Sequence, residues 1–113
     1  MKIFQNKKVF ITGCGGMLGK AVYEKFAPHC QVLATDIDLN ESWLEYGDII
    51  DFKKISEKAF KFEPDLIINL AALTDLEYCE KNPEITWKTN ALGAENMALI
   101  SKRLGATHIY VST

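Results

Sequence analysis

The stretch Val-Phe-Ile-Thr-Gly-Cys-Gly-Gly-Met-Leu-Gly, from Val9 to Gly19, decides the fold of this chain. An apolar strand runs into three glycines, and the glycines open an amphipathic helix. Gly13 permits a tight reversal, Gly16 lets a pyrophosphate approach the backbone, and Gly19 lets the helix pack closely on the strand. The first helical N–H groups then face an anion. The pattern predicts a turn that binds a dinucleotide.

The segments on either side give the motif the context that it requires. A strand is predicted over Lys8 to Thr12 and a helix over Met17 to Phe26. A mononucleotide P-loop is a competing interpretation, because Gly19-Lys20 resembles its end. It fails because its first glycine would fall on Cys14 and because Ala21 replaces the Ser or Thr that binds magnesium. A glycine-rich turn that binds no ligand stays open as an alternative.

A second signal lies at the end of the next predicted strand, Gln31 to Asp36. A carboxylate at that strand tip accepts hydrogen bonds from the adenosine ribose hydroxyls and repels a 2′-phosphate. Asp36 therefore favours NAD(H) as the cofactor, with NADP(H) possible, and Asp38 is placed to share the role. The other interpretation of Asp36 is an ordinary loop carboxylate, since turns favour aspartate.

Further along, strands and helices alternate. The predicted elements are a short strand or irregular connection within Trp43 to Ile50, a helix from Phe52 to Phe62 capped by Asp51, a buried strand from Asp65 to Ala72, a short helix from the Thr74 capping box to Lys81, a long helix from Asn82-Pro83 to Leu104, and a last β segment from Thr107 to Thr113.

Each of the two longer helices has a predicted apolar side. In the Phe52 to Phe62 helix this side consists of Ile55, Ala59, Phe60 and Phe62. In the long helix the apolar set is core or interface, and it consists of Ile85, Ala91, Leu92, Met97, Ile100 and Leu104. Gly105 ends the long helix.

The alternation predicts an α/β fold, a Rossmann-type doubly wound parallel sheet with strand order 3-2-1-4-5 that is truncated after the fifth strand. In such a sheet a ligand lies across the carboxyl ends of the strands. We therefore expect it to touch Gly16, Asp36, Asp48, Ala71 and Thr113.

Composition narrows the classes of function. The chain has 113 residues, of which 48% are hydrophobic and 25% charged, with a net charge of −2. These values describe one ordinary globular domain and argue against nucleic acid as a partner. No segment has the length of a membrane span and the first residues lack the apolar core of a signal peptide, so we expect no membrane partner and a cytoplasmic location.

The cysteines and histidines predict no metal site. Cys14, Cys30 and Cys79 are widely separated and read as reduced thiols, while His29 and His108 are isolated. Cys14, inside the glycine turn, is either a thiol activated by the helix N-terminus or a small residue that fits there, and we expect the second.

Taken together, these residues resemble the extended short-chain dehydrogenase/reductase superfamily, which carries Thr-Gly-x-x-Gly-x-x-Gly as it stands here from Thr12 to Gly19. Within it, the chain is most similar to the dTDP-4-dehydrorhamnose reductase group. The segments that carry this similarity are Ala71 to Glu80, Asn82-Pro-Glu, Thr89 to Asn96 and Val111-Ser-Thr.

The resemblance implies a role for individual residues of this chain. Around the cofactor, it implies that the pyrophosphate is lined by Gly13, Gly16, Met17 and Leu18, the ribose by Asp36, the adenine by Asp48 and Ile49, and the nicotinamide side by Ala71, Ala72 and Leu73; Gly19 is a further cofactor-binding residue. It also implies that Asn90 helps to order the active site and that Thr113 is the catalytic hydroxyl that binds the sugar carbonyl.

The resemblance also implies a Tyr-x-x-x-Lys pair whose tyrosine donates a proton while the nicotinamide donates hydride to a 4-keto sugar nucleotide. That pair is absent here. The positions four residues after Tyr23, Tyr46 and Tyr78 are Ala27, Ile50 and Asn82, and Tyr110 would need a residue 114.

We therefore expect residues 1–113 to be the NAD(P)-binding, Rossmann-like domain of a longer NAD(P)-dependent sugar-nucleotide reductase, with the substrate half absent and the chain inactive by itself. Two alternatives stay open: a nucleotide-sugar epimerase or dehydratase of the same superfamily, and a non-catalytic, dinucleotide-binding regulatory subunit. The resemblance further implies a homodimer through the helix of residues 83–104.

Overall fold

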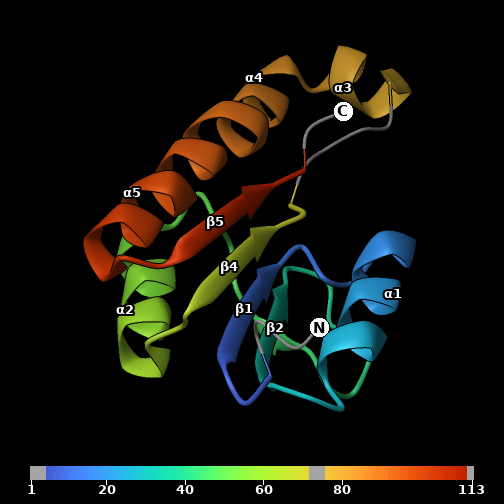
Figure 1. Cartoon of the computed structure of the whole chain (residues 1–113). Coiled ribbons are helices and arrows are strands. Elements are labelled where there is room, and N and C mark those ends of the chain that lie inside the picture. Colours follow the sequence, from blue (N-terminus) through green and yellow to red (C-terminus); the bar gives the residue numbers. More distant parts are fainter. Residues whose placement is uncertain (1–4, 72–75, 112–113) are drawn as a thin grey trace.

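The computed structural model describes residues 5–71 and 76–111. Strands and helices alternate along the chain (Figure 1). The order is β1 (Lys8–Thr12), α1 (Met17–Phe26), β2 (Gln31–Asp36), β3 (Glu45–Tyr46), α2 (Phe52–Phe62), β4 (Leu66–Asn69), α3 (Leu76–Lys81), α4 (Pro83–Trp87), the π-helix η2 (Lys88–Gly93), α5 (Ala94–Leu104) and β5 (Thr107–Tyr110).

The strands form one parallel sheet in the order β3-β2-β1-β4-β5. This confirms the predicted order 3-2-1-4-5. Strand β1 lies in the middle, where Phe10 is in register with Leu33 on one side and with Ile67 on the other. All the strands point the same way, so their carboxyl ends meet along one edge of the sheet.

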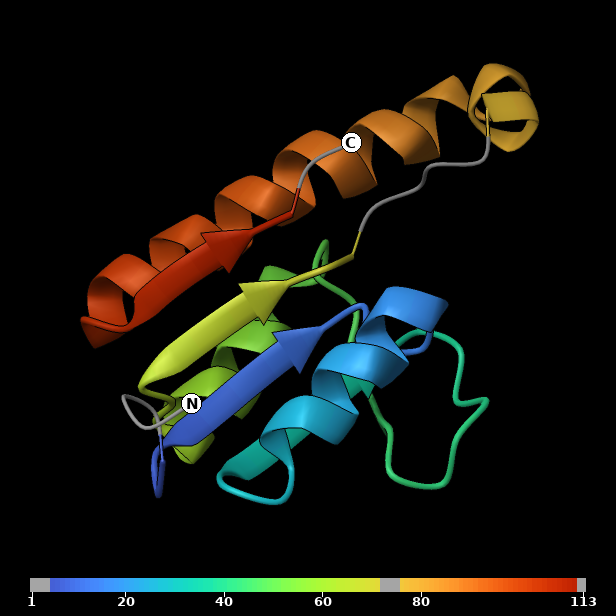
Figure 2. The same ribbon diagram turned by 45° about the vertical axis from the view of Figure 1, so that its right-hand side comes forward.

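Helices cover both faces of the sheet (Figures 1 and 2), as the doubly wound fold requires. On one face, Val9 and Ile11 of β1 pack with Val22, Tyr23 and Phe26 of α1. The ring of Tyr23 stacks on Trp43, with centroids 3.9 Å apart, so the connection after β2 also packs on α1.

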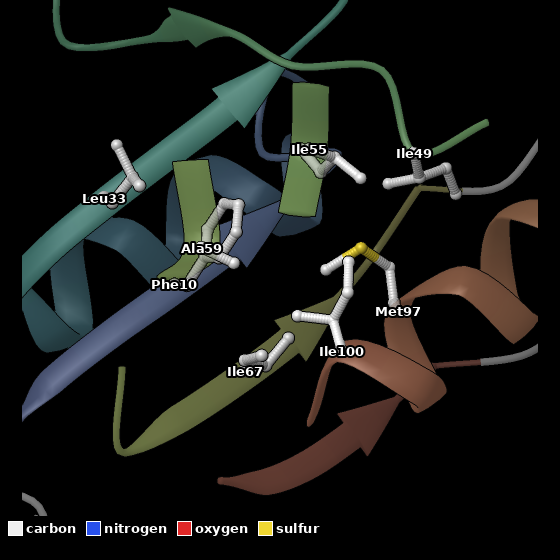
Figure 3. Close-up of a cluster of buried hydrophobic side chains, with 8 residues drawn as sticks. All are labelled: Phe10, Leu33, Ile49, Ile55, Ala59, Ile67, Met97 and Ile100. Carbon is white, nitrogen blue, oxygen red and sulfur yellow. The ribbon is translucent and has the colours of Figure 1, made fainter. Parts of the chain in front are cut away.

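The other face carries the larger core (Figure 3). Helices α2 and α5 lie side by side against the sheet, and their buried side chains meet those of β1, β2 and β4. The members of this cluster are Phe10, Leu33, Ile49, Ile55, Ala59, Ile67, Met97 and Ile100. Ile49 is the member that comes from neither a helix nor a strand.

Several helix boundaries follow directly from the sequence. The Asp51 side chain accepts a hydrogen bond from the Lys54 N–H at 3.3 Å and so caps α2, as predicted. Gly105 ends α5 in the left-handed conformation, with a φ of 66°. At the start of α4, Asn82 occupies the cap position but its side-chain amide donates to the Tyr78 carbonyl instead. Thr74, predicted to start α3, lies outside the described residues.

The long helix differs from the prediction because one turn of it is π-helical. Four residues spaced four apart have a defined environment: Ile85 and Thr89 line a cavity described below, and Gly93 and Met97 are buried. On an α-helix a step of four residues overshoots a full turn by about 40°, so such a row drifts around the helix. A π-turn contains more residues per turn than an α-turn and so counteracts such a drift.

Two further predictions, on Phe60 and on the end of the fourth strand, need correction. Phe60 is 39% exposed, since it follows the buried Ala59 by one residue and so points away from the core. In the long helix, whose apolar set was predicted as core or interface, Met97 and Ile100 are core, whereas Ala91 and Leu92 are exposed. Strand β4 ends at Asn69, before Ala72, and the Ala71 backbone that follows lies close to Gly13 of the glycine turn. Within the described ranges, no helix is long and apolar enough to cross a membrane.

Candidate functional site

A cavity of about 520 Å³ lies along the carboxyl ends of the strands. This volume is in the range of small-molecule and cofactor sites. The cavity is bordered by a residue at or just after the end of each strand of the sheet. Its lining consists of Gly13, Gly16, Met17, Leu18, Gly19, Asp36, Ile37, Gly47, Asp48, Ile49, Ile50, Leu70, Ala71, Tyr78, Ile85, Thr89 and Val111.

The three glycines of the turn differ in what surrounds them. Gly13 has a φ of 68°, and a Cβ there would lie 2.3 Å from the Ala71 nitrogen. A Cβ on Gly19 would lie 2.3 Å from the Cys14 carbonyl oxygen. A Cβ on Gly16, by contrast, would have nothing within 4 Å. Gly13 and Gly19 are therefore needed for packing, whereas Gly16 borders open space in the cavity.

The start of α1 suits an anion. Gly16 is its N-cap, with extended backbone (φ −86°, ψ −178°), and no side chain caps the helix. The first turn carries no acidic residue. The unsatisfied N–H groups of a helix start and its dipole both favour a negatively charged group in this place. Met17, the first helical residue, is 94% exposed, so its side chain does not pack over this turn.

Asp36 is fixed at the cavity edge by two backbone groups. Its Oδ2 accepts from the Gly15 N–H and its Oδ1 from the Asp38 N–H, both at 2.9 Å. Asn40 completes the arrangement, since its Nδ2 donates to the Gly15 carbonyl at 3.1 Å. The Asp36 carboxylate thus joins the end of β2 to the glycine turn and is not a freely solvated loop carboxylate. Asp38 is exposed and does not line the cavity.

The connection between β3 and α2 forms another wall. The Gly47 N–H donates to the Asp36 carbonyl at 3.1 Å. The Asp48 side chain accepts from the Ile50 N–H and its carbonyl from the Asp51 N–H, both at 3.1 Å. Ile49 is 3% exposed and reaches the core cluster as well as the cavity. Asp48 and Ile49, both predicted from the sequence, therefore lie together in one wall.

Asn69 supports the floor of the cavity from beneath. It is fully buried at the end of β4, and its Oδ1 accepts from Thr12 Oγ1 at 2.7 Å and from the Ala71 N–H at 3.1 Å. Its Nδ2 has no hydrogen-bond partner within the described part of the chain. Because the Ala71 backbone also contacts Gly13, Asn69 fixes the point where the two loops meet.

Cys14 is not a reactive thiol. It is fully buried, and its Sγ lies 3.2 Å from the Gly19 carbonyl oxygen. Burial, together with the negative charge of Asp36, raises the pKa of the Cys14 thiol to about 12. The expectation that Cys14 is a small residue that fits the turn is therefore confirmed. Among the described residues, no group of His, Cys, Asp and Glu side chains is arranged to hold a metal.

Nine of the predicted site residues line this cavity: Gly13, Gly16, Met17, Leu18, Gly19, Asp36, Asp48, Ile49 and Ala71. Asn90 does not line it; Asn90 lies in η2 beside the lining residue Thr89, and its carbonyl is 3.4 Å from the Tyr110 hydroxyl. Ala72, Leu73 and Thr113 lie outside the described residues. The lining residues that the sequence reasoning missed are Ile37, Gly47, Ile50, Leu70, Tyr78, Ile85, Thr89 and Val111.

Comparisons with known proteins give a consistent result. The sequence profile described as RmlD substrate binding domain matches residues 7–113. The spore coat polysaccharide biosynthesis protein SpsK of Bacillus subtilis is 31% identical over 94% of this chain and 35% of its own length. Methionine adenosyltransferase 2 subunit beta of Xenopus tropicalis is 32% identical over 95% of this chain and 32% of its own length.

A solved structure extends the comparison to three dimensions. The dTDP-4-dehydrorhamnose reductase of Bacillus anthracis, in complex with NADP, matches with a TM-score of 0.83 and 30% identity over 95% of this chain and 36% of that one. The likeness confirms the Rossmann-like fold of the N-terminal part. The chain spans about a third of the length of the curated relatives that it matches.

Proposed function

The chain belongs to the RmlD substrate binding domain family, and from this premise we propose that it is the cofactor-binding part of an NAD(P)-dependent nucleotide-sugar oxidoreductase, most like dTDP-4-dehydrorhamnose reductase. One observation carries the proposal. Gly16 opens onto the cavity at an uncapped helix start, and the fixed carboxylate of Asp36 lies at the edge of the same cavity. These two features match the pyrophosphate and the adenosine ribose of a dinucleotide.

The remaining lining residues have roles that follow from their positions. The pyrophosphate lies against Gly13, Gly16 and the first turn of α1, and the adenine lies against Asp48 and Ile49. Ala71 borders the nicotinamide side, which Ala72 and Leu73 extend. When bound, the dinucleotide supplies or accepts a hydride. The described residues bind and orient it.

The rest of the active site belongs to the longer protein. Asn90 helps to order that site from the long helix, and Thr113 binds the sugar carbonyl through its hydroxyl. The proton donor is a tyrosine of a Tyr-x-x-x-Lys pair, which these 113 residues do not contain. We therefore expect the chain alone to bind the cofactor without turning over a 4-keto nucleotide sugar. The relative of known structure, itself a reductase, supports an enzymatic parent protein.

The cofactor preference is tested by Asp36→Ala. We expect the affinity for NADH to fall by about tenfold or more, because hydrogen bonds to a carboxylate contribute about 1.5–3 kcal/mol, and the gap between NADH and NADPH to narrow. Fluorescence titration of both cofactors measures this, and a melting curve checks that loss of the Gly15 contact leaves the fold intact. Asp38→Ala is the matched control, because its side chain lies outside the cavity. Unchanged affinities for both cofactors in Asp36→Ala would contradict the role.

A regulatory, non-catalytic dinucleotide-binding subunit is the second candidate. The observation that favours it is the exposure of large apolar side chains along the long helix, where Trp87 is 59% exposed. The same surface serves a homodimer through residues 83–104. Sedimentation equilibrium of the chain, with and without NADH, distinguishes self-association from a monomer that reserves this surface for another protein.

A further inference from the structure

We propose that Asn96, which lies outside the cavity, is a positioning residue for the wall that receives the adenine. This inference rests on the proposed dinucleotide binding and adds to it a device that sets the shape of the adenine side. The wall consists of residues 47–50, between β3 and α2, and we call it the 47–50 wall. It belongs to neither a strand nor a helix, so its position depends on what holds it from outside.

The first contact is a hydrogen bond across the core. The Nδ2 of Asn96, in α5, donates to the Ile49 carbonyl at 2.8 Å, between residues 47 positions apart in sequence. On either side of Ile49, the Ile50 N–H is bonded locally to the Asp48 side chain, and the Gly47 N–H, at the start of the wall, donates to the Asp36 carbonyl at the end of β2. The Asn96 bond is thus the one that ties the middle of the wall to a distant element.

The second contact is steric. Gly93, the last residue of η2, is buried, and a Cβ there would lie 2.3 Å from Ile49 Cδ1 and 2.5 Å from its Cγ1. The backbone of the long helix therefore touches the Ile49 side chain directly. Met97, one turn further along, packs in the same cluster, and Figure 3 shows it beside Ile49. Ile49 is held from two directions, by its carbonyl and by its side chain.

The third observation is that the same helix also borders the cavity. Ile85 and Thr89 are lining residues, and the π-helix η2, which contains Thr89, ends at Gly93, which contacts Ile49. One helix therefore forms part of the cavity with its first half and holds the 47–50 wall with its second half. The helix therefore sets the distance between the cavity side formed by Ile85 and Thr89 and the 47–50 wall. Asn96 is the polar contact that connects the helix to this wall.

The consequence of losing this link is local. Without a donor, the Ile49 carbonyl is left in a part-buried place with no partner, which destabilises the 47–50 wall unless the peptide moves toward water. Such a movement displaces Ile49 and Asp48 from the adenine. The glycine turn is built from β1 and α1 and has no share in the bond. Binding of the pyrophosphate should therefore not change.

The test uses Asn96→Asp, which keeps the shape of the side chain but removes its donor, together with Asn96→Ala. Calorimetric titration with ADP-ribose measures binding that includes the adenine and hence the 47–50 wall. Titration with inorganic pyrophosphate measures binding to the glycine turn alone. We expect ADP-ribose to bind about fivefold to tenfold more weakly and pyrophosphate to bind within twofold of the wild type. Ser101→Ala is the matched control, since Ser101 bonds to the Met97 carbonyl of its own helix and does not reach the wall.

Amide hydrogen exchange without ligand tests the tether by itself. We expect faster exchange at Ile50 and Asp51 in both Asn96 variants, with Ser101→Ala and the amides of the glycine turn unchanged. Unchanged exchange at the wall, or an equal loss of affinity for both ligands, would overturn the positioning role. A wild-type chain that binds neither ligand, while the Asn96 variants still loosen the wall, would instead overturn the proposed function and leave the tether in place.

Discussion

At the scale of single residues, the glycines of the turn divide into two kinds. Gly13 and Gly19 have backbone atoms of other residues where a Cβ would be, so the fold itself requires them. Gly16 has a backbone conformation open to other residues and free space above it. Because the packing does not require a glycine at this helix start, we expect a ligand in the cavity to require it.

This division predicts opposite results for two substitutions. Gly16→Val should leave the circular dichroism spectrum unchanged and alter the free energy of unfolding by no more than about 1 kcal/mol, because the only structural loss is a glycine N-cap that makes no side-chain bond. The same substitution should abolish NADH binding, because the valine side chain fills the space for the pyrophosphate. Gly19→Ala should instead lower the free energy of unfolding by about 1–3 kcal/mol, because its Cβ overlaps the Cys14 carbonyl. Titration and urea unfolding measure the pair. If Gly16→Val bound NADH with the wild-type affinity, the pyrophosphate would not lie against Gly16.

The amide side chains show where sequence reasoning stops at this scale. The glycines and Asp36 were predictable because each has a known consequence for the backbone or for a ribose at that spacing. Asn69 and Asn96 carry no such signal, because their partners include a backbone amide and a backbone carbonyl brought close by the fold. An asparagine on a buried strand or a helix could equally have faced solvent.

At the scale of elements, β5 carries a titratable group in an apolar place. His108 is partly buried, its Nε2 has no partner within the described residues, and burial lowers its pKa from the ordinary 6.5. The unfolded chain then binds a proton more readily than the folded chain does. The free energy of unfolding should therefore fall as the pH drops from 6.5 toward the lowered pKa of the folded state.

Urea unfolding at pH 7.5 and at pH 5 tests this prediction. We expect a loss of stability on acidification that is smaller in His108→Gln, which cannot take up the proton. His29→Gln, which removes the other histidine, serves as the control and should keep the wild-type difference. If the free energy of unfolding fell equally in the wild type and in His108→Gln, the pH dependence would come from carboxyl groups and not from His108.

Most elements were predictable because they have clear ends. The predicted bounds of β1, α1, β2 and α2 are those observed, since glycines, Asp51 and Pro64 mark them. The π-turn was not predictable, because the same residues are compatible with a regular α-helix. At its last residue, Gly93, the helix backbone lies close to the Ile49 side chain, a tertiary contact that the helix sequence does not reveal.

At the scale of the whole molecule, the cavity joins parts of the chain that are far apart in sequence. It is lined by residues from the end of every strand and from α1 and the long helix. A ligand bound there contacts both helical layers and the sheet at once. Its binding free energy should therefore oppose global unfolding and not merely order one loop.

The melting temperature reports this coupling. With NADH at about 100 times its dissociation constant, the folded state gains about 2.7 kcal/mol, which corresponds to a rise of about 10 °C for a domain of this size. Scanning calorimetry measures the rise. Gly16→Val should melt at the same temperature with and without NADH. A wild-type protein with measurable NADH affinity and no thermal shift would show that its unfolded chain also binds NADH.

The central place of β1 has a consequence for how the protein is made. One neighbour of β1, the strand β2, follows closely in sequence, but the other is β4, and the Thr12–Asn69 bond between β1 and β4 spans 57 residues. At about 5–20 residues per second, a ribosome needs roughly 3 to 11 s to cover that distance. During this interval β1 exposes an unpaired apolar edge, on which a chaperone or a neighbouring nascent chain can act before β4 emerges.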